Sequence, residues 1–166
     1  MYIIVTSKTA FDSLMVRKNI TADNVEDWRS TFFISINSTL PVPQSGEEDE
    51  PPYFDKNYAN VLVQRFDDVD EDLYREGKGR IATAFTFAQA QEMYDFIIKN
   101  LHRKSCVVHC AAGVSRSGAV GSFVNEIIKG DWKTFREVNP HTHPNMHVVQ
   151  MLRRVHRERE AVNGQK

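Results

Sequence analysis

The string HCAAGVSRSG at positions 109–118 constrains this chain more than any other segment. The apolar residues 106–108 before it predict a short buried strand, and the weakly charged run 119–128 after it predicts a helix. A strand that passes into a helix through small residues surrounds a concave space with backbone N–H groups at the positive end of the helix dipole. Such a loop is suited to bind a tetrahedral oxyanion.

Two residues of the string point from binding to chemistry. A free thiol titrates near ~8.5, but helix N-termini and nearby cations lower that value to roughly 3.5–7.5, so we expect Cys110 to be a thiolate at neutral pH. The planar guanidinium of Arg116 can hold two phosphate oxygens at once, which a lysine ammonium does less well. A thiolate and a guanidinium around one anion-binding loop predict transfer of a phosphoryl group to sulfur.

The rest of the string supports these two residues. Small or apolar residues let the backbone amides close on a phosphate, and together with Arg116 they form the predicted phosphate-binding loop: Ala111, Ala112, Gly113, Val114 and Ser115. The hydroxyls of Ser115 and Ser117 are short enough to donate toward the sulfur or to orient the loop. We interpret His109 as a hydrogen-bonding support for the loop and not as a base.

The string is similar to the signature of the cysteine-based protein tyrosine phosphatases, and most similar to that of the dual-specificity branch. Residues 139–145 (NPHTHPN), followed by Gln150-Met151-Leu152, resemble that branch's Pro-Asn segment and the helix after it. Residues 61–68 resemble the strand that leads into the family's acid loop. The resemblance spans about residues 60–160 and implies a phosphatase with a phosphocysteine intermediate.

Transfer of phosphate to sulfur needs a proton for the departing oxygen, and general acid catalysis contributes roughly 10²–10⁴-fold. The candidates are crowded into one short stretch: Asp67, Asp68, Asp70, Glu71 and Asp72. Strand alternation does not choose among them, because the strand is expected to end by Phe66. The resemblance selects Asp68, with Asp70 as the alternative. Residues 76–80 make the distance from this acidic loop to Cys110 longer than the family pattern.

The expected reaction needs neither a metal nor another cofactor, because Arg116 and the loop amides stabilise the developing charge. His141, His143 and His147 lie close enough in sequence to suggest zinc. However, no carboxylate or cysteine lies among them and two prolines interrupt the segment, so a turn and a helix start are the favoured interpretation.

Composition excludes several classes of protein. The 166 residues carry a formal net charge of −1, which argues against a nucleic-acid partner bound by phosphate neutralisation. No stretch approaches the roughly 18 apolar residues of a membrane span, and residues 1–7 are expected to form a strand and not a signal peptide. The expected partner is a phosphorylated protein.

The two cysteines are not expected to pair. Cys106 and Cys110 lie on one predicted strand about 13 Å apart at ~3.3 Å per residue, whereas a disulfide needs Cα atoms within roughly 7 Å. Two free thiols suit a reducing compartment, so the predicted location is cytoplasmic.

Strands are expected at 2–6, 32–36, 61–66 and 106–109, and helices at 10–17, 86–101, from the loop to about 130, and 146–159. This alternation predicts an α/β fold with a central, mostly parallel sheet flanked by helices and a ligand site at the carboxyl ends of the strands. We expect one phosphatase domain over 1–166, an exposed Pro-rich acidic loop at 41–58 and a disordered tail at 160–166.

Substrate class is the open question. Protein phosphotyrosine, with or without phosphoserine and phosphothreonine, is what the resemblance implies. The uncharged loop interior places a phosphoinositide or inositol-phosphate phosphatase second and an RNA 5′-phosphatase third. A protein that only binds phosphotyrosine is the non-enzymatic alternative, and the intact Cys110, Arg116 and Ser117 argue against it.

Overall fold

The computed structural model describes residues 1–39, 51–77 and 79–163. Its centre is a parallel sheet of order β1-β6-β2-β3, and a separate antiparallel hairpin joins β4 to β5. The elements are β1 (Tyr2–Ser7), α1 (Lys8–Arg17), a 3-10 turn (Val25–Asp27), β2 (Thr31–Asn37), β3 (Val61–Arg65), β4 (Leu73–Arg75), β5 (Gly79–Ala82), α2 (Phe87–Asn100), β6 (Ser105–Cys110), α3 (Arg116–Ile127), α4 (Trp132–Val138) and α5 (Met146–Asn163).

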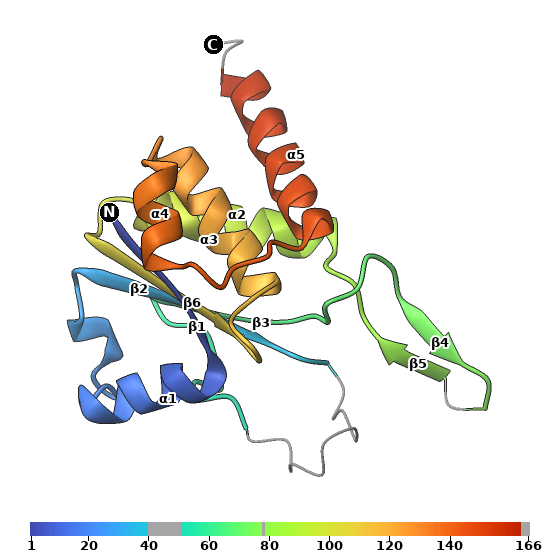
Figure 1. Cartoon of the computed structure of the whole chain (residues 1–166), viewed down its shortest axis with the longest axis horizontal. Helices are drawn as coiled ribbons and strands as arrows, with labels where there is room; N and C mark the ends of the chain where they lie inside the picture. The colour runs from blue at the N-terminus through green and yellow to red at the C-terminus, as the bar shows by residue number, and fades with distance from the viewer. Residues whose placement is uncertain (40–50, 78, 164–166) are drawn as a thin grey trace.

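Helices cover both faces of the sheet, as Figure 1 shows, with α1 on one face and α2, α3, α4 and α5 on the other. The two faces bury separate apolar cores, the larger beneath α2, α3 and α5 and the smaller beneath α1. The central strand β2 is buried along six of its seven residues, as expected of a strand covered on both faces. The predicted α/β fold is therefore confirmed.

The side chain of a buried asparagine, Asn139, forms hydrogen bonds with backbone groups along the outer edge of β1. The side chain of Asn139 accepts from Val5 N at 2.7 Å and donates to Ile3 O at 3.1 Å, as a neighbouring strand would. The same amide donates to Phe135 O at 3.0 Å and so ties the end of α4 to the sheet. This contact anchors the segment between α4 and α5, which crosses the carboxyl end of the sheet.

Parts of the structure depart from the sequence expectations. The hairpin β4–β5 and helix α4 were not expected. Residues 160–163, expected in a disordered tail, form the end of α5, and residues 164–166 lie outside the described residues. Residues 40–50 of the expected exposed loop also lie outside them. The remainder of that loop is not simply exposed, because Phe54 is buried against Phe11 beneath α1.

Candidate active site

The segment from Cys110 to Arg116 joins the end of β6 to the start of α3 at the carboxyl end of the sheet, as predicted. Gly113 has φ +76°, and a Cβ there would lie 2.4 Å from Ser7 N and from the Thr6 carbonyl carbon. Only glycine therefore allows the loop to pass this close to the end of β1.

Hydrogen bonds from two neighbouring segments hold the loop carbonyls. Lys8 N donates to Ala111 O at 3.1 Å, His143 N to Val114 O at 3.1 Å and Asn145 N to Ser115 O at 3.2 Å. The start of α1 and the start of α5 thus fix the loop from outside. Ala111 and Ala112 are exposed at its rim, whereas Gly113 is buried.

The structure brings the predicted nucleophile and its hydroxyl partner together. Cys110 Sγ lies 3.1 Å from Ser117 Oγ, and both side chains are buried at the base of the loop. Cys110 also faces the N-terminal end of α3, where the helix dipole favours negative charge. Cys106 is free as well, and burial raises the pKa of its thiol, so it behaves as a small apolar residue. The expectation of two unpaired cysteines is confirmed.

Arg116 is 7% exposed, and the ends of two strands hold its guanidinium. Its Nη1 donates to Phe66 O at 2.7 Å, just after β3, and to Ser38 Oγ at 3.3 Å, just after β2. A guanidinium carries five N–H donors in a fixed plane, so this anchoring at one nitrogen orients the others. Neither partner was predicted from the sequence, because Phe66 binds through its backbone carbonyl and Ser38 lies far from Arg116 in the chain.

The clustered acidic residues have different surroundings. Asp67 is part of the local backbone structure: it accepts from Thr83 N at 2.8 Å and also from the backbone and side chain of Thr39. Asp72 accepts from Ala84 N at 2.9 Å and pairs with Arg80 at 3.2 Å, and these contacts lower the pKa of its carboxyl. Asp70 is exposed.

Asp68 is the member of the cluster that reaches the loop. Its Oδ1 accepts from Ser115 Oγ at 2.9 Å and from Asn145 Nδ2 at 2.7 Å, while its side chain stays exposed. Asn145 also accepts from Val148 N at 3.1 Å and so caps the start of α5. Asn145 was quoted in the sequence only as part of the Pro-Asn segment. An asparagine directly before a predicted helix was the signal for its capping role.

His109 lies behind the loop and not in it. Its Nε2 is 2.8 Å from Ser35 Oγ, and its ring lies 4.1 Å from that of Phe11, centroid to centroid. Burial lowers the pKa of His109 to about 4, with smaller effects of the Cys110 backbone, Lys8 and Arg116. The imidazole is therefore neutral at pH 7.

The histidines after α4 do not form a metal site in the described ranges, which contain no group of three or more histidine, cysteine, aspartate or glutamate side chains placed to hold an ion. His147 Nε2 instead lies 2.8 Å from Phe85 O. This contact joins α5 to the segment that precedes α2.

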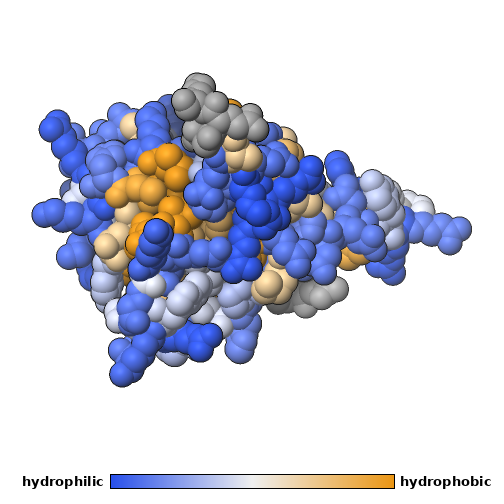
Figure 2. All heavy atoms as spheres, turned by 90° about the horizontal axis from the view of Figure 1, so that it is seen from above, coloured by the Kyte–Doolittle hydropathy of each residue, from blue (hydrophilic) through white to orange (hydrophobic). Residues whose placement is uncertain are grey.

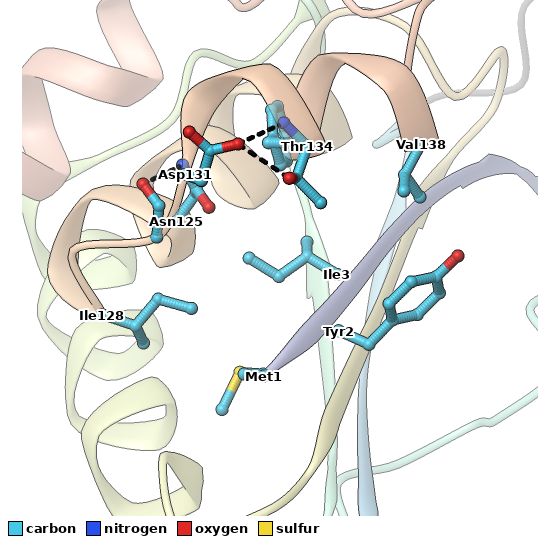
Figure 3. A pocket seen from close by; sticks show the side chains of 10 residues that line it. Met1, Tyr2, Ile3, Asn125, Ile128, Asp131, Thr134 and Val138 are labelled. Atoms are coloured by element: carbon cyan, nitrogen blue, oxygen red, sulfur yellow. Dashed lines mark hydrogen bonds between the residues drawn. The ribbon is translucent and has the colours of Figure 1, made fainter.

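Among the hollows that the described residues form, two lie at opposite ends of the sheet. A cleft of about 320 Å³ adjoins the loop and is lined by Ala111, Ser38, Lys8 and Arg65, among others. A second hollow, of about 300 Å³, lies between the start of β1 and α4 (Figure 3). Asp131, one of the polar residues that line it, accepts from the backbone and hydroxyl of Thr134 and serves as the cap of α4. The candidate catalytic residues Cys110, Arg116 and Asp68 lie at the carboxyl end of the sheet, beside the first of these hollows.

No protein-family model and no curated protein matches this sequence. Among solved structures it is similar to the human tyrosine phosphatase-like serine/threonine/tyrosine-interacting protein, at 19% identity and a TM-score of 0.47 over 86% of this chain and 83% of that one. The PTP-2 phosphatase of Cydia pomonella is 16% identical with a TM-score of 0.49, and the match covers 92% of this chain and 84% of that one. Human DUSP28 is 16% identical with a TM-score of 0.46, and the match covers 99% of this chain and 95% of that one.

Within the described part of the chain, none of the helices combines the length and the apolar character needed to cross a bilayer.

Proposed function

We propose that this protein is a cysteine-dependent phosphatase that hydrolyses phosphate monoesters, with phosphotyrosine on proteins as its main substrate. One observation carries the proposal. Cys110 Sγ, in contact with Ser117 Oγ, lies at the base of a loop that also holds Arg116, with Asp68 hydrogen-bonded at its mouth.

In the first step, the thiolate of Cys110 attacks phosphorus in line with the ester oxygen. A P–S bond forms as the P–O bond to the substrate breaks, and the departing oxygen takes the bonding pair and a proton from Asp68. The loop amides and Arg116 stabilise the negative charge on the transferred phosphoryl group.

In the second step, a water attacks the phosphocysteine. Asp68, now a carboxylate, accepts a proton from the water as the new P–O bond forms. The P–S bond breaks, the sulfur leaves with the bonding pair as a thiolate, and inorganic phosphate is released. The Ser117 hydroxyl, 3.1 Å from the sulfur, donates toward the departing thiolate.

The loop supports a substrate with a single phosphate, because Ala111 and Ala112, which are exposed at its rim, carry no charge. One observation favours a phosphoinositide or inositol phosphate as a second candidate: Lys8 and Arg65 line the cleft beside Ala111. Lys8 already pairs with Asp12 at 2.6 Å, and Arg65 is directed to Ser38 O, so protein phosphotyrosine remains the first choice.

We further infer that residues 1–166 act as one domain and that the protein works in the cytoplasm. The two free cysteines support a reducing compartment. The near-neutral net charge of −1 does not favour a nucleic-acid partner.

The test is hydrolysis of p-nitrophenyl phosphate with and without vanadate, without added metal. We expect turnover by the wild type, inhibition by vanadate and loss of activity to background in Cys110→Ser. Cys106→Ala is the matched control, since it removes the other buried thiol of β6 and should retain turnover. Tight binding of a phosphotyrosine peptide by the wild type without hydrolysis would instead assign the protein as a phosphotyrosine-binding module. A panel of phosphopeptides and phosphoinositides then ranks the substrates.

A further inference from the structure

The hairpin β4–β5 stands apart from the body of the protein. Figure 1 shows that it projects on the side of the sheet where β3 ends, and Figure 2 shows a projection from the body of the molecule. All of β4 is exposed, and in β5 only Ala82 is buried. Three of its side chains are large, apolar and exposed: Leu73 is 40% exposed, Tyr74 69% and Ile81 42%. A two-stranded ribbon is marginally stable alone, so exposed apolar residues on it suggest a contact with a partner.

The base of the hairpin is fixed to the candidate site. Asp67 N donates to Thr83 O at 2.7 Å, and Thr83 N donates back to the Asp67 carboxylate at 2.8 Å. Asp72 accepts from Ala84 N and pairs with Arg80 across the ribbon. Asp67 directly precedes Asp68. The residue that holds the base of the hairpin is therefore the chain neighbour of the proposed acid.

We propose that the outer side chains and free strand edges of this hairpin bind the polypeptide that carries the phosphate, in an extended conformation. The proposal rests on the proposed function and deepens it, because it makes the substrate a polypeptide. An extended chain can pair with a strand edge through its backbone and place alternate side chains against Leu73, Tyr74 and Ile81. Continuity with the loop through Asp67 and Asp68 lets one chain occupy both places.

Two other occupants fit less well. Strands of three and four residues offer far less area than the ~800 Å² per partner of a stable protein interface, which disfavours a dimer built on the hairpin alone. A small phosphate ester held in the loop would not extend along a ribbon whose longer strand spans roughly 13 Å.

The experiment compares two substrates on one triple variant, Leu73→Thr, Tyr74→Thr and Ile81→Thr. Threonine removes the apolar surface and keeps strand propensity. The substrates are p-nitrophenyl phosphate and unfolded, carboxymethylated lysozyme phosphorylated on tyrosine. We expect unchanged kinetics on the small ester and a rise of roughly tenfold in KM for the polypeptide. The matched control replaces Val16, Ile98 and Val162, which are exposed apolar residues on helices, by threonine and should change neither.

An unchanged KM for the polypeptide in the hairpin variant overturns the proposal. A wild-type dimer that the hairpin variant dissolves, seen by sedimentation, also overturns it and assigns the hairpin to a second copy. If the wild type hydrolyses neither substrate, the proposed function fails, and fluorescence anisotropy of the same labelled phosphopolypeptide on Cys110→Ser still decides. Weaker binding with the hairpin substitutions supports the proposal, and equal binding overturns it.

Discussion

Asp67 and Asp68 are neighbours in the chain, and their contacts assign them different roles. Asp67 binds backbone N–H groups of Thr83 and Thr39, whereas Asp68 meets Ser115 and Asn145 at the mouth of the loop. Alternation along a strand does not distinguish them, because the strand has ended at Arg65. The folded structure shows that Asp68, and not Asp67, is hydrogen-bonded to the loop residue Ser115.

Replacing Asp68 by asparagine should lower kcat for phenyl phosphate by roughly 10²-fold or more. The phenoxide that leaves this ester is basic and needs a proton as it departs. The loss should be smaller on p-nitrophenyl phosphate, whose leaving group departs readily as an anion. Steady-state kinetics on both esters measure the difference. Asp70→Asn is the control and should change neither; a larger loss in that variant would transfer the acid role to Asp70.

Asn145 both caps α5 and donates to Asp68, and two substitutions separate these roles. Asn145→Asp keeps an acceptor for the helix but loses the donor, so kcat should fall between roughly ten- and a hundredfold while the melting temperature is retained. Asn145→Ala should lose kcat and also about 1 kcal/mol of stability. If Asn145→Asp keeps full kcat, the asparagine is a cap only.

At the scale of elements, the strand–loop–helix unit was predictable because its residues are contiguous. The parallel sheet was also predictable, because strands alternate with helices along the chain. The hairpin was not predictable: β4 has three residues, and the charged run around Gly77 has no strand period. Phe54 lies in a Pro-rich acidic segment, and its burial depends on Phe11, which lies far away in sequence.

A substitution at Gly113 tests whether the loop needs its close approach to the end of β1. Gly113→Ala places a Cβ 2.4 Å from the backbone of β1, so we expect activity to fall to background and the melting temperature to drop. Gly77→Ala is the matched control: its φ is +72° but its Cβ would meet nothing within 4 Å. It should cost roughly 1 kcal/mol and leave turnover of p-nitrophenyl phosphate intact. Equal effects of the two substitutions on turnover would contradict the required close approach.

At the scale of the whole molecule, contacts between distant segments place the site residues. Asn139 pairs with β1 across more than 130 positions, and Arg116 binds the ends of two strands. Sequence reasoning named Cys110, Arg116, Ser117 and Asp68 from local order and resemblance. It did not find Phe66 O and Ser38 Oγ, the distant groups that hold Arg116, because these become its neighbours only when the sheet assembles.

Burial of His109 links the stability of the whole fold to pH. Its pKa is about 4 in the folded protein and 6.5 in a model peptide, so the unfolded chain binds more protons between these values. Stability contributed by the neutral ring is therefore lost as the pH falls from about 6.5 toward 4, by about 2 kcal/mol between pH 7 and pH 5. Urea unfolding at both pH values measures this loss. His109→Gln should reduce it; an unchanged loss would show that other groups cause it.

The central claim is that phosphate passes through the sulfur of Cys110. Rapid quenching of the enzyme into alkaline denaturant during turnover of p-nitrophenyl phosphate, followed by peptide mass spectrometry under conditions that preserve the P–S bond, tests it directly. The account predicts a phosphoryl group on the peptide that contains Cys110, and none on that peptide in Cys110→Ser. A phosphoryl group on another residue, or full turnover by Cys110→Ser, would contradict it.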